Sequence, residues 1–147
     1  SISLNNPYAF MHGPTFMANP LACAAALKTI EIMERDHLAD RSLEIGRKVT
    51  ERYKKMQEKY TVIGDIRGLG GMVGIEFVRD MKTKEPYPEL VAALVAETAK
   101  HGLLVENAGT YGNVIRFLAP LVITDEQLEC GLDIFDECIG ICVDKLK

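Results

Sequence analysis

Hydrophobic residues recur at steps of three and four along three stretches of the chain, a spacing that puts them on one face of a helix. One stretch runs from about Asp40 to Tyr60, and the others begin near Leu90 and at Leu128. Their apolar stripes consist of Ile45, Val49, Tyr53, Met56 and Tyr60; of Leu90, Val91, Leu94, Val95 and Thr98; and of Leu128, Leu132, Phe135, Ile139, Cys142 and Leu146. The pattern predicts three amphipathic helices with polar outer faces.

Two helix starts are marked by capping residues. Asn19 before Pro20 predicts a helix from about Pro20 to about Arg35, because Asn accepts hydrogen bonds from first-turn amides and Pro suits the first helical position. Alanine is abundant in its first turns, so another element's backbone can approach closely. Thr124 with Gln127 three residues later predicts a capping box for the last helix.

The remaining apolar segments alternate with polar or small residues, as in strands. Val62 to Arg67 and Met72 to Val78 predict a hairpin around the glycines at 68, 70 and 71. Leu103 to Glu106 and Val114 to Leu118 predict two more strands, joined by a loop rich in Gly and Asn. The order of elements predicts an α+β fold with two layers, a small and mostly antiparallel sheet with helices on one face.

The chain shows no internal repeat and no linker rich in Pro, Gly or Ser. Residues 1–18 hold two prolines and several aromatic residues without sustained periodicity. We therefore expect an N-terminal arm at 1–18, which needs another surface to lie against, and one domain at 19–147.

Composition limits the classes of function. The 147 residues are 48% hydrophobic and 26% charged, which is typical of a globular domain. The net charge of −4, with no basic block, argues against nucleic acid and acidic lipid as partners. The longest apolar run, Pro20 to Leu27, is too short to span a membrane. We expect a cytoplasmic protein.

The four cysteines do not suggest a disulfide framework or a metal centre. They are few, and no export signal opens the chain. No CxxC occurs, and the pair Cys138 and Cys142 has no neighbouring His to complete a zinc site. We expect reduced thiols and no bound metal.

Arg116 is the most informative single residue. It shares a strand face with Val114 and Leu118, so we expect a permanent cation among apolar neighbours, where an unpaired charge is costly. One explanation is structural, with Glu106 on the preceding strand as its partner or a side chain that reaches water from an edge. The other is functional, a bidentate clamp for a substrate carboxylate. The sequence pattern leaves both open.

Other motifs carry less information. Gly68 to Met72 lies between two predicted strands, so a turn is favoured over a dinucleotide-binding loop. GxxxxGK[ST], HExxH and GxSxG are absent, which argues against common NTPase and hydrolase classes. Thr15, shortly before the Asn19-Pro20 helix start, lies where a phosphate could bind, although the residues alone favour an ordinary loop with its own turn hydrogen bonds.

Three ordered motifs resemble the class III (omega-amino acid) aminotransferases, enzymes that use pyridoxal 5'-phosphate. They are His12 to Ala26 (HGPTFMANPLACAAA), Asp65 to Glu76 (DIRGLGGMVGIE), and Gly109 to Leu121 (GTYGNVIRFLAPL) followed by ITDEQL. The third motif resembles the 4-aminobutyrate aminotransferase branch in particular. The resemblance covers nearly the whole chain.

This resemblance implies that the chain is the C-terminal small domain of a fold-type I enzyme. It implies an upstream large domain with the Schiff-base lysine, a homodimer, and amino acid and 2-oxo acid substrates. Thr15 is implied to bind the cofactor phosphate, and Arg116 the substrate's α-carboxylate, with 2-oxoglutarate as amino acceptor. Because no lysine of this chain lies in a plausible cofactor site, we expect the isolated chain to be inactive and not to hold the cofactor.

One departure concerns the substrate. The stretch His12 to Met17 resembles the diaminopelargonate (adenosylmethionine-8-amino-7-oxononanoate) aminotransferases more than the 4-aminobutyrate enzymes, so that branch and other class III members remain alternatives. A further alternative is a stand-alone, non-catalytic module that binds a small carboxylate or another protein.

Overall fold

The computed structural model describes residues 18–146. Contacts along the chain define two units, 1–37 and 38–147. Most of the arm expected at 1–18, including Thr15, lies outside the described residues, and the boundary at residue 18 remains a prediction.

The first unit contains helix α1 (Pro20–Arg35), which begins as its sequence predicts. The side-chain oxygen of Asn19 accepts hydrogen bonds from the amides of Leu21 and Ala22 at 3.0 and 3.3 Å. No residue of α1 is buried, and the side chains of Leu21 and Leu27 are 80% and 70% exposed. The helix therefore presents a large apolar surface.

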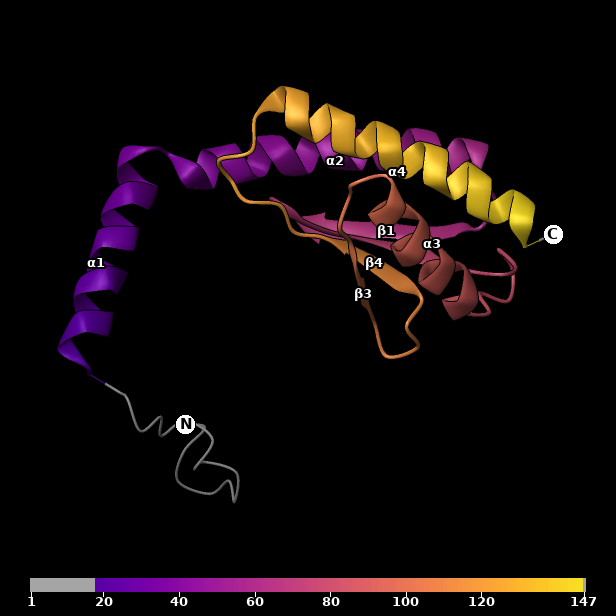
Figure 1. The fold of residues 1–147 in the computed structure, drawn as a ribbon, viewed down its shortest axis with the longest axis horizontal. Helices are drawn as coiled ribbons and strands as arrows, with labels where there is room; N and C mark the ends of the chain where they lie inside the picture. The colour runs from indigo at the N-terminus through magenta and orange to yellow at the C-terminus, as the bar shows by residue number, and fades with distance from the viewer. Residues whose placement is uncertain (1–17, 147) are drawn as a thin grey trace, which may run out of the picture. The chain divides into compact units, whose positions relative to one another are not determined.

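The second unit is the predicted α+β fold, shown in Figure 1. Its four strands form one antiparallel sheet in the order β1-β2-β4-β3. In chain order its elements are α2 (Leu38–Lys59), β1 (Ile63–Leu69), β2 (Met72–Phe77), α3 (Pro88–Lys100), β3 (Glu106–Ala108), β4 (Val114–Phe117) and α4 (Asp125–Lys145).

All three helices of this unit lie on the same side of the sheet. The inward-facing residues of β2, namely Val73, Ile75 and Phe77, are buried together with Ile115 of β4. They pack against the apolar stripes of α2, α3 and α4, and α4 runs alongside α2 in Figure 1. The predicted helix stripes are thus the core of this unit, and the opposite sheet face carries no helix of this unit.

One predicted strand is wrong in its bounds. We expect a strand from Leu103 to Glu106, whereas β3 begins only at Glu106. The amide of Leu103 donates to the carbonyl of Thr98 at 2.9 Å, so Leu103 closes the end of α3 and cannot join the ladder through that amide. β1 also extends two residues beyond its predicted end, to Leu69.

The glycine-rich segment between β1 and β2 is a tight turn, as predicted. Leu69 and Met72 are paired, and Gly70 adopts a φ of 55°, which is a left-handed conformation that favours glycine. The Ser42 hydroxyl of α2 accepts a hydrogen bond from the Gly71 amide at 2.8 Å. A Cβ on Gly46 would overlap the Gly70 carbonyl, so the turn lies directly against α2.

The four cysteines carry free thiols, and burial raises the pKa of the Cys138 and Cys142 thiols. Within residues 18–146, no three His, Cys, Asp or Glu side chains converge as a metal site would require. Over the same residues, no helix combines the length and the apolar character needed to cross a membrane.

Candidate functional site

The sheet face opposite the helices carries the charged residues of the strands. Because side chains alternate along a strand, the buried Val73, Ile75 and Phe77 leave Met72, Gly74 and Glu76 on the other side. We call this side the open face. Along with these residues of β2, it carries Asp65, Arg67 and Leu69 of β1, Val114 and Arg116 of β4, and Glu106 and Ala108 of β3.

Strand register brings four of these residues into one row across the open face. Gly74 pairs with Arg67 on one side and with Arg116 on the other, and Arg116 pairs with Glu106. Directly opposed residues in antiparallel strands point to the same side of the sheet. The row therefore consists of an arginine, a bare glycine position, a second arginine and a glutamate.

Arg116 forms an ion pair with Glu106, whose carboxylate oxygen lies 2.8 Å from its Nη2 atom. The partner that the structural explanation named is therefore present. The expectation that Arg116 lies enclosed among apolar neighbours is wrong, because its side chain is 42% exposed and Leu118 is 61% exposed. With its helices all on the other side, the sheet leaves this cation at a surface, where it can meet a further ligand.

Arg67 is held more firmly than Arg116. Its Nη1 atom lies 2.7 Å from a carboxylate oxygen of Asp65 and 2.5 Å from one of Glu76. Hydrogen bonds to Asp65 and then to Glu76 raise the pKa of the Arg67 guanidinium. Arg67 therefore has two anionic partners where Arg116 has one, which makes Arg116 the arginine better placed to take a new anion.

Asn113 fixes the start of the strand that carries Arg116. This side chain is buried, and its Nδ2 atom donates to the Phe77 carbonyl at 3.0 Å and to Glu76 at 3.4 Å. The backbone carbonyl of Asn113 accepts a hydrogen bond from the Phe77 amide at 2.8 Å. The sequence pattern gives no signal for this role, since an Asn in a Gly-rich loop is an ordinary turn residue.

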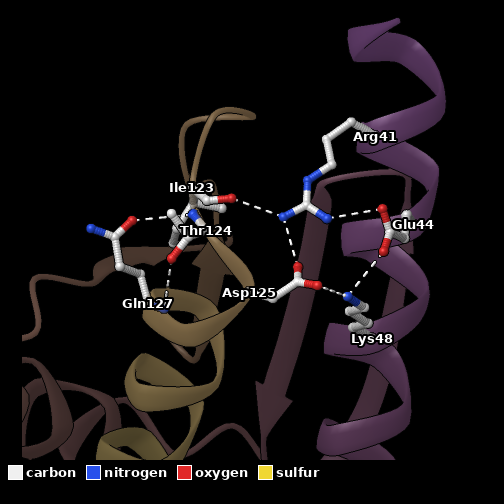
Figure 2. Close-up of polar contacts among 7 residues, drawn as sticks. All are labelled: Arg41, Glu44, Lys48, Ile123, Thr124, Asp125 and Gln127. Atoms are coloured by element: carbon white, nitrogen blue, oxygen red, sulfur yellow. Dashed lines mark hydrogen bonds and ion pairs between the residues drawn. The ribbon is translucent and has the colours of Figure 1, made fainter.

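A cluster of charged residues fixes the chain that follows β4 (Figure 2). Arg41 of α2 donates to the Ile123 carbonyl and to Asp125, each at 2.8 Å, and to Glu44 at 2.9 Å. Lys48 contacts Asp125 at 2.6 Å and Glu44 at 2.9 Å. Hydrogen bonds from Lys48 and then Arg41 lower the pKa values of both carboxyls.

These contacts hold the connection from β4 to α4 at the end that leads into α4. The Thr124 hydroxyl accepts from the Gln127 amide, and the Gln127 side chain accepts from the Thr124 amide, which confirms the predicted capping box. Next to this connection lies a cavity of about 340 Å³, lined mainly by apolar residues such as Phe117, Ile123 and Leu128. The segment after Arg116 is thus anchored to α2 while Arg116 itself faces outward.

Three lysines of the described residues do not suit a Schiff base with pyridoxal 5'-phosphate. A lysine that forms a Schiff base needs a lowered pKa. Lys48, Lys59 and Lys100 have pKa values that are raised, chiefly by hydrogen bonds to Asp125, Tyr60 and Glu97. Thr15, the residue we expect at the cofactor phosphate, lies outside the described residues.

Solved structures define the class of protein to which this fold belongs. An aminotransferase from Bacillus anthracis superposes with a TM-score of 0.81 at 33% identity, over 94% of this chain and 32% of that chain. An amine transaminase from an uncultivated Pseudomonas species, solved in its PLP-bound internal aldimine form, gives a TM-score of 0.80 at 28% identity. It matches over 92% of this chain and 31% of its own. The fold is that of one part of a transaminase.

Sequence comparisons name the family. The aminotransferase class-III family model matches residues 2–139, and this chain belongs to that family. It is 44% identical to the 5-aminovalerate aminotransferase DavT of Pseudomonas aeruginosa over 126 residues, 86% of this chain and 30% of that protein. It is 42% identical to the 4-aminobutyrate aminotransferase of Mycobacterium leprae over 137 residues, 93% of this chain and 30% of that protein. The chain thus spans about a third of the length of the relatives it matches.

Proposed function

We propose that this chain is the C-terminal domain of a pyridoxal-phosphate-dependent omega-aminotransferase that transfers an amino group to 2-oxoglutarate. In this proposal Arg116 binds the α-carboxylate of glutamate or 2-oxoglutarate. The observation that carries it is the position of Arg116, a half-exposed guanidinium on the open face. Relatives named for 4-aminobutyrate and 5-aminovalerate support an amino donor with a distant carboxylate.

The ion pair between Arg116 and Glu106 is of a kind in which a substrate carboxylate can replace the Glu106 carboxylate. A guanidinium presents a planar fork of donors that matches a carboxylate, and it stays charged at every physiological pH. Glu106 is 73% exposed and its contact with Arg116 is a single 2.8 Å bond to one guanidinium nitrogen. Exposed pairs of this kind are weak, so a substrate carboxylate can displace Glu106 and form a bidentate contact in its place.

The exposed apolar surfaces support a further part of the enzyme as partner. Leu69 and Met72 on the open face, and Leu118 directly after β4, are each more than half exposed. The two leucines of α1, Leu21 and Leu27, are exposed as well. Surfaces of this kind mark interaction sites. We propose that a large cofactor-binding domain, in a cytoplasmic homodimer, covers them and supplies the Schiff-base lysine.

Thr15 is proposed to bind the cofactor phosphate in that complete enzyme. Thr15→Ala in the complete enzyme then weakens cofactor retention, because a hydrogen bond to a charged group is worth about 1.5–3 kcal/mol. Thr15→Ser keeps the hydroxyl and serves as the control. Equal cofactor dissociation constants for the parent and Thr15→Ala would remove this role.

Inhibition by glutarate, a dicarboxylate without an amino group, tests the role of Arg116 in the complete enzyme. Arg116→Ala raises the inhibition constant on the order of 10-fold or more, because it removes a charge-assisted contact. Arg79→Ala is the matched control, since Arg79 pairs with Glu85 and Glu89 rather than with a residue of the row. An unchanged inhibition constant in Arg116→Ala would contradict the proposal.

A further inference from the structure

Gly74 lies beside Arg116 at a position where the fold does not demand glycine. A Cβ built on Gly74 meets no atom closer than Val114 Cγ1 at 3.5 Å and the Arg67 carbonyl at 3.7 Å, which are ordinary contacts. Gly74 is also absent from the glycines of residues 18–146 that have a positive φ, which are Gly70, Gly102, Gly109 and Gly112. An alanine would therefore fit here, and it would suit the strand better.

Gly68 on the neighbouring strand shows the contrast. A Cβ there would overlap the Met72 carbonyl, so the β1–β2 hairpin itself accounts for that glycine. No such contact accounts for Gly74. A glycine inside a strand commonly marks a place where a ligand or another backbone approaches closely.

The place that Gly74 leaves bare is the sheet surface between two arginine positions, Arg67 on β1 and Arg116 on β4. Gly74 is paired with both Arg67 and Arg116, so a side chain at position 74 would stand between them on the open face. Opposed Cβ atoms in an antiparallel pair are only about 4.5–5.5 Å apart. Any side chain at position 74 would thus occupy the sheet surface next to Arg116, where we place the ligand of Arg116.

We propose that Gly74 is a specificity-determining residue that keeps this surface clear for the carboxylate end of the substrate. The proposal rests on the proposed role of Arg116. Gly74 makes no contact through a side chain, and it acts by leaving room for the carboxylate and its adjoining carbon beside the guanidinium. A larger residue here excludes acid-bearing substrates and leaves the fold intact.

The test compares Gly74→Ala and Gly74→Val in the complete enzyme, with glutamate and butylamine as acid-bearing and acid-free amino donors. Gly74→Val should lower kcat/KM for glutamate on the order of 10-fold, mainly through KM, since a misfit of methylene size has effects of this order. Gly74→Ala should have a smaller effect in the same direction. In both variants kcat/KM for butylamine should change much less than kcat/KM for glutamate, and Tm should not fall.

Gly131→Ala is the matched control, because a Cβ on this α4 glycine also meets nothing closer than 3.6 Å. It should leave the ratio of the two donors unchanged. Equal losses on both donors, or an unchanged kcat/KM for glutamate in Gly74→Val, would overturn the proposal. If the valine variant does not fold, equal donor ratios in Gly74→Ala and Gly131→Ala would overturn it instead.

Arg116→Ala, measured beside these variants, separates the two proposals. If it abolishes the preference for glutamate while Gly74→Val retains that preference, the inference on Gly74 fails and the proposed function stands. If Arg116→Ala retains the preference, the proposed function fails, and the inference on Gly74 fails with it.

Discussion

Glu106 and Arg116 are register partners on β3 and β4, and their side chains form a 2.8 Å ion pair on the open face. The ion pair gives the Arg116 guanidinium an anionic partner on the sheet face that no helix of this unit covers. It also means that a ligand carboxylate must compete with Glu106 for the same guanidinium.

Removing the charge of Glu106 should therefore strengthen substrate binding. We expect Glu106→Gln in the complete enzyme to lower KM for glutamate by about two- to five-fold, the range that exposed ion pairs support. Glu89→Gln is the control, because Glu89 pairs with Arg79 away from the row. A raised KM in Glu106→Gln alone would show that Glu106 assists binding and does not compete.

The cluster around Asp125 should make stability depend on pH. Contacts with Lys48 and Arg41 lower the pKa values of Asp125 and Glu44 in the folded state. A lowered carboxyl pKa contributes stability that is complete above the unfolded pKa, near 4, and is lost as the pH falls through the folded pKa. Asp125→Asn should thus lower the urea midpoint at pH 7 and lose that deficit below about pH 4.

Glu58→Gln is the control for this pH profile, because the Glu58 side chain is exposed and makes no ion pair among residues 18–146. Its urea midpoint should follow that of the parent at every pH. If the urea midpoint of Asp125→Asn stays below that of the parent by a constant amount down to pH 3, the start of α4 is damaged for a reason other than charge.

The isolated chain should not form a covalent adduct with pyridoxal 5'-phosphate at one defined lysine. The perturbed lysines Lys48, Lys59 and Lys100 have raised pKa values, which disfavours the neutral amine that attacks an aldehyde. Borohydride reduction of the mixture, followed by peptide mass analysis, measures the outcome. Stoichiometric labelling of one lysine would contradict this expectation.

Local patterns in the sequence predicted the local structure well. The Asn19 cap, the Thr124 capping box and the glycine turn before Met72 each depend on neighbours within a few residues, and each is present. The predicted bounds of β3 are wrong because the Leu103 amide donates to the preceding helix.

The row on the open face could not be predicted in the same way. Gly74 and Arg116 lie far apart in the sequence, and their pairing depends on the strand order β1-β2-β4-β3. The exposure of Arg116 likewise follows from the placement of all three helices on one side, which the helix stripes alone do not connect to a particular arginine. The position of Glu106 on the preceding strand does predict it as a partner of Arg116, and the ion pair confirms that prediction.

The most direct test of the role of Arg116 is the donor selectivity of Arg116→Lys in the complete enzyme, which keeps the charge and removes the planar fork. Arg79→Lys is the matched control. The account predicts that kcat/KM for glutamate falls by roughly 10-fold or more, that butylamine is far less affected, and that Tm is retained. Equal losses on both donors together with a lowered Tm would show that Arg116 serves the fold and not the substrate.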